Sequence, residues 1–224
     1  MLSYNNHKMK VTGKKYGYRV ASFDLLAGHT CPAASLCHSR VVVENGHRKI
    51  QDFGQFRCYA TKSEVAYTNV YNMRLRNFEL SKQDDFVSLV KTAIQAKKLT
   101  LIRIHSSGDF YDFEYFKKWY QIAQELPEVT FFAYTKQATF VKWYLANKLP
   151  NMAIHYSMGG LHDGYALKNN LPSCTVVLDT HETNETHFLD PQKNEWVPLA
   201  CLPDNIASDF EYIMRGESFG IKFH

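Results

Sequence analysis

Residues 99–109 read LTLIRIHSSGD, and this stretch decides the fold class. The run rich in Leu and Ile predicts a buried strand, and Ser-Ser-Gly-Asp predicts a tight turn at its carboxyl end. Phe113, Phe116, Tyr120 and Ala123 then recur at helical spacing. A strand, a polar turn and a helix in succession are typical of a βα unit.

The same order recurs with a period of roughly 25 to 30 residues, as parallel βα units do. We expect further strands at Val129–Tyr134, Met152–Ser157 and Cys174–Leu178, with a helix over Gln137–Asn147. Right-handed crossovers bring the carboxyl ends of such strands to one edge, where ligands usually bind. The pattern predicts an α/β fold that is either an incomplete (βα) barrel or a doubly wound sheet.

Regular elements are also expected on either side of these units, within a single domain of residues 1–224. The cysteine-bearing loop and the βα core take up about residues 16–178, and a C-terminal extension takes up about 179–224. We expect a first strand in 16–26, a hairpin of Arg40–Glu44 and Lys49–Phe53 around Asn45-Gly46, a helix over about 62–78 begun by a Thr61/Glu64 capping box, a helix over Asp84–Lys97 after Ser81, a short strand at His187–Leu189 and a final helix from Asp204 to about Arg215. Arg74 and Arg76 are expected on solvated helix faces.

The composition bounds the function class. The net charge of +4 and the pI near 8.7 leave nucleic-acid binding open without indicating it. No segment approaches the roughly 18 apolar residues that span a bilayer, and the N-terminus lacks the apolar stretch of a signal peptide. We therefore expect a cytoplasmic protein without a membrane contact. Its partner is left open between a host-cell component and a small-molecule substrate.

Three of the five cysteines form the strongest chemical pattern. Cys31, Cys37 and Cys58 lie in polar, turn-rich sequence, which suits metal ligands better than core thiols. Thiolates bind soft metals, and three of them can hold three irons of a [4Fe–4S] cluster. We expect an iron–sulfur protein, and buried thiols without a metal are the plain alternative.

The fourth ligand is open at this point. Cys201 lies in a loop-like context, whereas Cys174 begins an apolar run, so Cys201 is the favoured fourth cysteine. A structural zinc site is the chemical rival, with His29 or His38 completing a Cys₃His set. With no fourth protein ligand, one iron would be open to a substrate or cofactor.

Polar residues at the expected strand ends are candidate cofactor contacts. Ser107, Gly108 and Asp109 follow the strand at 99–105, and a carboxylate there can hold an ammonium group or a ribose hydroxyl. The alternative is a plain turn with Asp109 as a helix N-cap. His105, Tyr134 and His155 also lie at or near strand ends and are expected to line the same pocket. The candidate cofactor contacts are therefore Ser107, Gly108, Asp109, His105, Tyr134 and His155.

Five runs of sequence carry a resemblance: SFDLLAGHTCPAASLC at 22–37, RCYA at 57–60, RIHSSGDFYDFEYFKKW at 103–119, FFAYTK at 131–136 and IHYSMGG at 154–160. In this order they resemble the phage-encoded family called gene product eighty-eight. That family in turn looks like a divergent relative of radical S-adenosylmethionine (SAM) enzymes, in which three cysteines after the first strand of a (βα) barrel bind [4Fe–4S] and SAM binds the fourth iron. The resemblance implies that Cys31, Cys37 and Cys58 match those cysteines and that residues 107–109 match a SAM-binding turn.

Two functions follow. In the first, which we favour here, a [4Fe–4S] cluster is closed by Cys201 and has a redox or binding role in a phage protein of the host cytoplasm. In the second, the fourth iron is open and the protein is a radical enzyme that cleaves SAM. The wider cysteine spacing of this chain, compared with radical SAM enzymes, favours the first.

Overall fold

The computed structural model of the protein describes residues 1–4, 6–52, 54 and 57–222. It contains a nine-stranded sheet in the order β1-β2-β5-β6-β7-β8-β11-β10-β9 and a separate hairpin, β3–β4. The strands are β1 (Leu2–Ser3), β2 (Val20–Phe23), β3 (Arg40–Glu44), β4 (His47–Gln51), β5 (Leu101–Ile104), β6 (Thr130–Thr135), β7 (Met152–Ser157), β8 (Ser173–Val177), β9 (His187–Asp190), β10 (Glu195–Ala200) and β11 (Phe219–Lys222).

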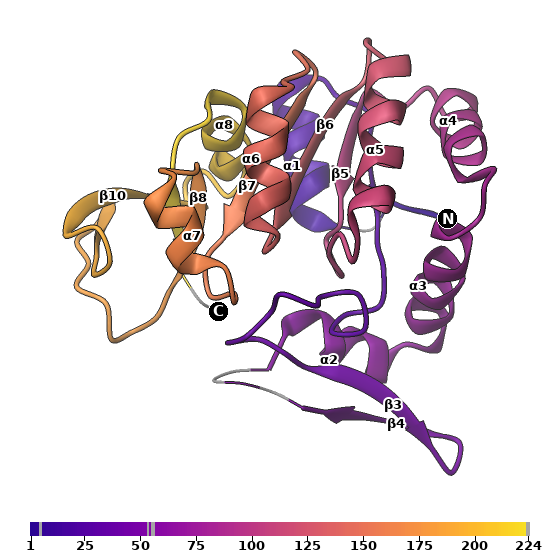
Figure 1. The fold of residues 1–224 in the computed structure, drawn as a ribbon, viewed down its shortest axis with the longest axis horizontal. Helices are drawn as coiled ribbons and strands as arrows, with labels where there is room; N and C mark the ends of the chain where they lie inside the picture. Colours follow the sequence, from indigo (N-terminus) through magenta and orange to yellow (C-terminus); the bar gives the residue numbers. More distant parts are fainter. Residues whose placement is uncertain (5, 53, 55–56, 223–224) are drawn as a thin grey trace.

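Helices pack on both faces of this sheet, with α5 and α6 in front and α1 and α8 behind in Figure 1. The helices are α1 (His7–Tyr16), α2 (Tyr59–Ala66), α3 (Thr68–Ser81), α4 (Phe86–Ala96), α5 (Phe113–Glu125), α6 (Ala138–Ala146), α7 (Asp163–Lys168) and α8 (Ser208–Arg215). In the described part of the chain, no helix is both long enough and apolar enough to cross a membrane.

The centre of the sheet confirms the predicted α/β fold. Strands β2, β5, β6, β7 and β8 are parallel and follow one another in chain order. Their carboxyl ends therefore share one edge, and α2 and the β3–β4 hairpin lie beyond that edge at the bottom of Figure 1. Among the described strands the sheet stays open, with β1 and β9 at its edges, so closure toward a barrel is not confirmed.

The two faces have different cores. On the face under α4, α5 and α6, the residues Phe23, Ile102, Phe86 and Trp119 belong to one large hydrophobic cluster. On the face under α1 and α8, a smaller cluster includes Met9, Phe132 and Phe210 and borders polar side chains. Alternate residues of each buried strand supply the two clusters, as the period of two in a strand requires.

Most predicted elements are present, and the α2–α3 region is the main correction. The single helix expected over 62–78 is two helices, because Tyr67 between them has extended backbone angles. Thr61 is inside α2 and Cys58 is its N-cap, so the Thr61/Glu64 capping box was wrong. Ser81 ends α3 instead of starting the next helix.

The hairpin and the C-terminal segment bear on the site. Asn45 and Gly46 have positive φ angles and join β3 to β4, as the sequence predicted, although Phe53 lies outside the described residues. The segment after residue 178 is not a separate layer, because β11 inserts into the main sheet between β8 and β10. The final helix, α8, begins at Ser208, later than the expected Asp204.

Candidate functional site

The loop that carries Cys31 and Cys37 leaves β2 at the carboxyl edge of the sheet and folds back on itself. Gly28 has φ +73°, and a Cβ there would lie 2.1 Å from the carbonyl oxygen of Ser39. A larger residue at position 28 would push the segments that carry Gly28 and Ser39 apart. Thr30 is fully buried, and its hydroxyl donates to the carbonyl of Leu26 at 2.7 Å. The loop is therefore a fixed structure with its two ends in contact.

Ser39 joins the two cysteine-bearing segments. Its buried hydroxyl accepts a hydrogen bond from the backbone N–H of Cys58 at 2.8 Å and donates to the carbonyl of Cys37 at 3.3 Å. The β3–β4 hairpin is the chain excursion between these two contacts. Cys37 and Cys58 are thus brought together despite the length of chain between them.

The three thiols lie close enough to interact. Burial raises the pKa of the Cys31 thiol well above its usual value, and the neighbouring Asp109, Cys58 and Cys37 raise it further. Burial, with a contribution from Cys37, raises the pKa of Cys58 to about 11. All three side chains are partly buried. Within the described residues, no three His, Cys, Asp or Glu side chains are placed around a single metal-ion position.

The Ser107–Asp109 turn lies directly against the cysteine loop. The carbonyl of Ser107 accepts from Leu25 N–H at 2.9 Å, and its hydroxyl donates to the Leu25 carbonyl at 2.9 Å. Gly108 has φ +84°, and a Cβ there would lie 2.6 Å from Thr30 Oγ1. The expected juxtaposition of turn and cysteine loop is therefore present as a close backbone contact.

Asp109 is buried and its carboxylate is already engaged. Its two oxygens accept from the backbone N–H groups of Phe110 at 2.7 Å and Lys136 at 2.8 Å. Burial raises its pKa to about 6 in spite of these bonds. Asp112, whose carboxylate accepts from Tyr115 N–H at 2.7 Å, is the N-cap of α5, so Asp109 is not the cap. Asp109 links the ends of β5 and β6 beside Cys31.

His105 is turned away from the cysteines. Its ring packs edge-on against Phe110, and its Nε2 shares a hydrogen bond of 2.8 Å with the Tyr115 hydroxyl on α5. Burial lowers its pKa to about 3, so the ring is neutral. These contacts place His105 on the face covered by α4, α5 and α6 and not beside the other strand-end residues.

Tyr134 and His155 lie on the opposite face, under α8. The Tyr134 hydroxyl donates to Asp209 Oδ2 at 2.9 Å, and His155 Nε2 bonds to the Glu217 carbonyl at 2.9 Å. Burial lowers the pKa of His155 to about 4, and its Nδ1 is buried without a partner. The three predicted strand-end residues are thus divided between the two faces of the sheet.

Cys201 has different neighbours from the first three cysteines. It follows β10, and its backbone N–H donates to Ser208 Oγ at 2.8 Å. Burial raises the pKa of its thiol, and the nearby Asp209 raises it further while Lys8 lowers it. Cys174 is close enough to be affected by Cys201, and burial raises its pKa to about 12. Cys201 and Cys174 therefore form a second pair of thiols, next to Lys8 and Asp209.

Glu64 joins the parts of the site, whereas the sequence predicted it as part of a helix capping box. Its fully buried carboxylate accepts from Ala27 N–H at 2.9 Å, from the Ser107 hydroxyl at 3.4 Å and from Arg74 Nη1 at 2.9 Å. Arg74 is buried and forms an ion pair with Glu64, so the expectation of a solvated Arg74 was wrong. One ion pair thus connects the cysteine loop, the turn and α2 to α3.

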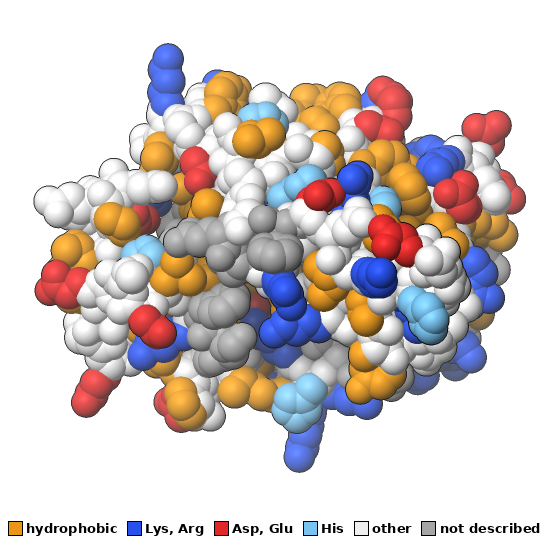
Figure 2. Space-filling view, turned by 90° about the horizontal axis from the view of Figure 1, so that it is seen from below, with side chains coloured by type: hydrophobic (Ala, Val, Ile, Leu, Met, Phe, Trp, Pro, Cys, Tyr) orange, Lys and Arg blue, Asp and Glu red, His pale blue; other side chains and the backbone are white. Residues whose placement is uncertain are grey.

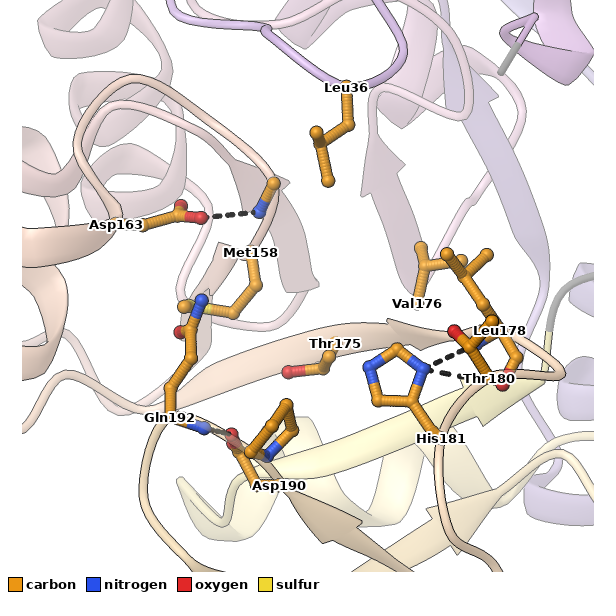
Figure 3. Close-up of a pocket in the computed structure, with 12 residues that line it drawn as sticks. Leu36, Met158, Asp163, Thr175, Val176, Leu178, Thr180, His181, Asp190 and Gln192 are labelled. Carbon is orange, nitrogen blue, oxygen red and sulfur yellow. Dashed lines mark hydrogen bonds between the residues drawn. The ribbon is translucent and has the colours of Figure 1, made fainter. Parts of the chain in front are cut away.

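A pocket of about 250 Å³ adjoins the cysteine loop through Leu36. Figure 3 shows Thr175, His181 and Asp190 around it, with Leu36 on the opposite side from Asp190. His181 Nδ1 accepts from Leu178 N–H at 3.0 Å. The sequence did not indicate this pocket, because its residues come from separate elements, among them β8, β9 and α7, and from the loops between them.

The outer surface over this edge of the sheet carries no single sign of charge. Figure 2 shows Lys and Arg side chains interspersed with Asp, Glu and His across the face seen from below. Such a mixed face does not add to the modest basic balance of the whole chain.

Comparison with known proteins identifies the family. The model of the family described as Gene product 88 matches residues 1–210. The chain belongs to this phage protein family. The family resemblance expected from the sequence is thereby confirmed, whereas a relation to radical SAM enzymes is not among the findings.

Two curated relatives are similar over part of their length. The Gene 88 proteins of Mycobacterium phage L5 and Mycobacterium phage D29 are each 31% identical over 111 residues. That alignment covers 45% of this chain and 46% of each relative, so it spans about half of both. No solved structure matches the chain.

Proposed function

We propose that this member of the Gene product 88 family holds a [4Fe–4S] cluster on Cys31, Cys37 and Cys58 and has a redox or binding role. The observation that carries the proposal is the convergence of three thiols from two distant segments at the carboxyl edge of a parallel sheet. Ligand sites of α/β folds occur at this edge. When bound, such a cluster supplies one-electron chemistry.

The donor set suits a cluster better than a single ion. Zinc needs each donor sulfur about 2.3 Å from one metal atom. The three thiols interact without surrounding one such point. A cluster presents a separate iron to each thiolate, so it accepts a wider spacing than zinc does.

The electrostatics of the thiols support a cationic partner. Burial keeps the Cys31 and Cys58 thiols protonated at neutral pH, because a buried thiolate without a counter-charge is costly. Metal binding replaces those protons and supplies the missing positive charge. The protein's contribution is the fixed loop around Gly28 and Ser39, which holds the thiols near one another.

Cys201 is not part of this proposal, although it was the favoured fourth ligand at the sequence level. It lies beside Lys8, Asp209 and Cys174, and the pKa of the Cys31 and Cys58 thiols responds chiefly to other groups. We therefore propose three cysteine ligands and a fourth iron that a non-cysteine ligand completes. SAM is one candidate for that ligand and is included in the test.

The test is the iron and sulfide content of protein purified without air, with visible absorption and reduced EPR spectra recorded with and without SAM. Cys31→Ala, Cys37→Ala and Cys58→Ala should each lose most of the iron, whereas the matched controls Cys174→Ala and Cys201→Ala should keep it. Circular dichroism establishes that each variant is folded. Loss of iron in Cys201→Ala, or a colourless wild-type protein that carries one zinc, would contradict the proposal. An EPR signal that changes on adding SAM would identify the fourth ligand.

A further inference from the structure

Arg103 is a charged residue in the middle of the central strand β5. It lies between Ser22 of β2 and Phe132 of β6 in the strand register, on the face under α1 and α8. Its guanidinium carbon is 6.0 Å from the centroid of the Phe132 ring and 5.4 Å from that of Tyr134. These two aromatic contacts hold the planar head in place without using its N–H donors.

Those donors have no acceptor among the residues that the structure describes. Arg103 forms no hydrogen bond or ion pair there, and its Nε is buried without a partner. An arginine has five N–H donors, and leaving a buried donor unpaired costs about 1–3 kcal/mol. The Nε of the buried Arg74 also lacks a partner, but Arg74 donates from Nη1 to the Ala60 carbonyl and to Glu64, and Arg103 has no such bond. The unused donors of Arg103 therefore need an explanation.

The nearest carboxylates are committed to other groups. Asp209 forms an ion pair of 2.6 Å with Lys8 and accepts from the Tyr134 hydroxyl. Asp24 accepts from the Ser22 hydroxyl at 3.1 Å and from Ser106 N–H at 2.7 Å. Both affect the pKa of Arg103 from a distance, but neither forms a contact with its guanidinium group. The buried Nε of Arg103 therefore has no acceptor in either carboxylate.

The surroundings favour a negatively charged acceptor. The amide of Asn6, the N-cap of α1, donates to Ser106 Oγ at 3.1 Å, which fixes the start of α1 beside the end of β5. The first turn of a helix carries a partial positive charge. The charges of Arg103 and of Lys8, which lies in that turn, are close enough to interact. Arg103 and the start of α1 therefore lie near one another, with Lys8 already paired to Asp209.

We propose that Arg103 binds the carboxylate or phosphate group of a small-molecule ligand. A guanidinium group whose plane is fixed by aromatic rings and whose edge is free matches the two oxygens of either anion. The inference rests on Arg103 and its neighbours and not on the cluster.

The site lies next to the cysteines. Tyr59 follows Cys58, and its hydroxyl donates to the Ser106 carbonyl. Tyr59 and Arg103 are close enough for their charges to interact. The Tyr59 side chain is 64% exposed, so solvent reaches the region between the cysteines and Arg103. An anion on Arg103 would place the rest of its molecule near Cys58.

The test is calorimetric titration of the anaerobically purified protein with inorganic phosphate and with succinate, at constant ionic strength in chloride buffer. We expect at least one probe to bind, with at least ten-fold weaker binding in Arg103→Gln and partial recovery in Arg103→Lys. Arg76→Gln changes an exposed arginine and should bind as the wild type does. Preference for phosphate or for succinate identifies the source of the anion.

A second measurement separates binding from a structural role. Arg103→Gln removes a guanidinium without hydrogen bonds, so its melting temperature in chloride buffer should not fall below that of the wild type. Only the rise in melting temperature caused by the bound probe should disappear. The proposal is overturned if neither probe binds to the wild type, if Arg103→Gln binds equally well, or if that variant melts lower by the same amount with and without probe. Unchanged iron and sulfide in Arg103→Gln keeps this result separate from the test of the cluster.

Discussion

The two faces of the main sheet differ in the size of their hydrophobic clusters and in the charge beside them. Under α4, α5 and α6, large side chains such as Trp119, Phe86 and Phe131 form a continuous hydrophobic cluster. Under α1 and α8, the cluster is smaller and stands beside Arg103 and His155, which have buried atoms without hydrogen-bond partners. Trp119 Nε1 and His105 Nδ1 on the first face also lack partners, so unpartnered atoms do not distinguish the two faces. The difference is that the first face carries the larger hydrophobic cluster, whereas the second face has the charged Arg103 beside a smaller one.

The largest expected effect belongs to the hydrophobic face. Trp119→Ala should lower the free energy of unfolding by about 4 kcal/mol, because the ring is fully buried and contacts Phe23 and Phe86 with centroids 5.2 and 5.7 Å away. Urea unfolding followed by circular dichroism measures the change. A loss below about 1 kcal/mol would mean that this face is not the main source of stability.

The next effect concerns pH and the polar face. His155 is neutral in the folded protein, with a pKa of about 4, and has an ordinary pKa of 6.5 when unfolded. The unfolded state therefore binds the extra proton between those two values, and stability falls as the pH drops from 6.5 toward 4. The full shift corresponds to about 3 kcal/mol.

His155→Gln isolates this contribution. Its amide can still donate to the Glu217 carbonyl, which the imidazole now contacts. Urea unfolding of both proteins at pH 7, 5 and 4 gives the free energy of unfolding as a function of pH. The difference between the two slopes reports His155, because the effects of His105 and Asp109 are the same in both proteins and cancel. Equal slopes would show that His155 is not a buried neutral histidine.

A smaller effect is expected at the ion pair on the polar face. Lys8→Met leaves the buried carboxylate of Asp209 with only the Tyr134 hydroxyl and should cost about 2 kcal/mol at neutral pH. Lys15→Met, on the same helix, removes the more exposed pair with Glu211 and should cost clearly less than Lys8→Met. Thermal melts of both variants test the ratio. Equal losses would remove the distinction between a buried and an exposed pair on α1.

The fold was predictable because its signals are local. Hydrophobic runs and polar turns placed β5, β6 and β7 to within two residues, and Asn45-Gly46 placed the hairpin. The break at Tyr67 was missed because the residues on either side, in α2 and α3, both favour helix and tertiary contacts set the bend. β11 was missed because its register with β8 depends on a pairing of distant segments.

The candidate site was predictable in part. Cys31, Cys37 and Cys58 were selected by residue type and context, and their role as metal ligands stays a prediction. Arg103 lies within the strand predicted at 99–105, and the sequence did not single it out as a binding residue. The available signal was a charge between two isoleucines. Ser39 and Lys8 carry no such signal in the sequence. Ser39 matters through its hydrogen bond with the backbone of Cys58, and Lys8 through its ion pair with Asp209, and both partners are distant in the chain.

The contact between Ser39 and Cys58 means that the interval from Cys37 to Cys58 does not measure a distance in space. The chain leaves and returns at one hydroxyl group, and the described strands between are β3 and β4. The tip of this hairpin at Asn45-Gly46 is exposed, so we expect residues added or removed there to leave the meeting point of the two cysteines unchanged. The tip is also a suitable place for an affinity tag or a fluorescent label.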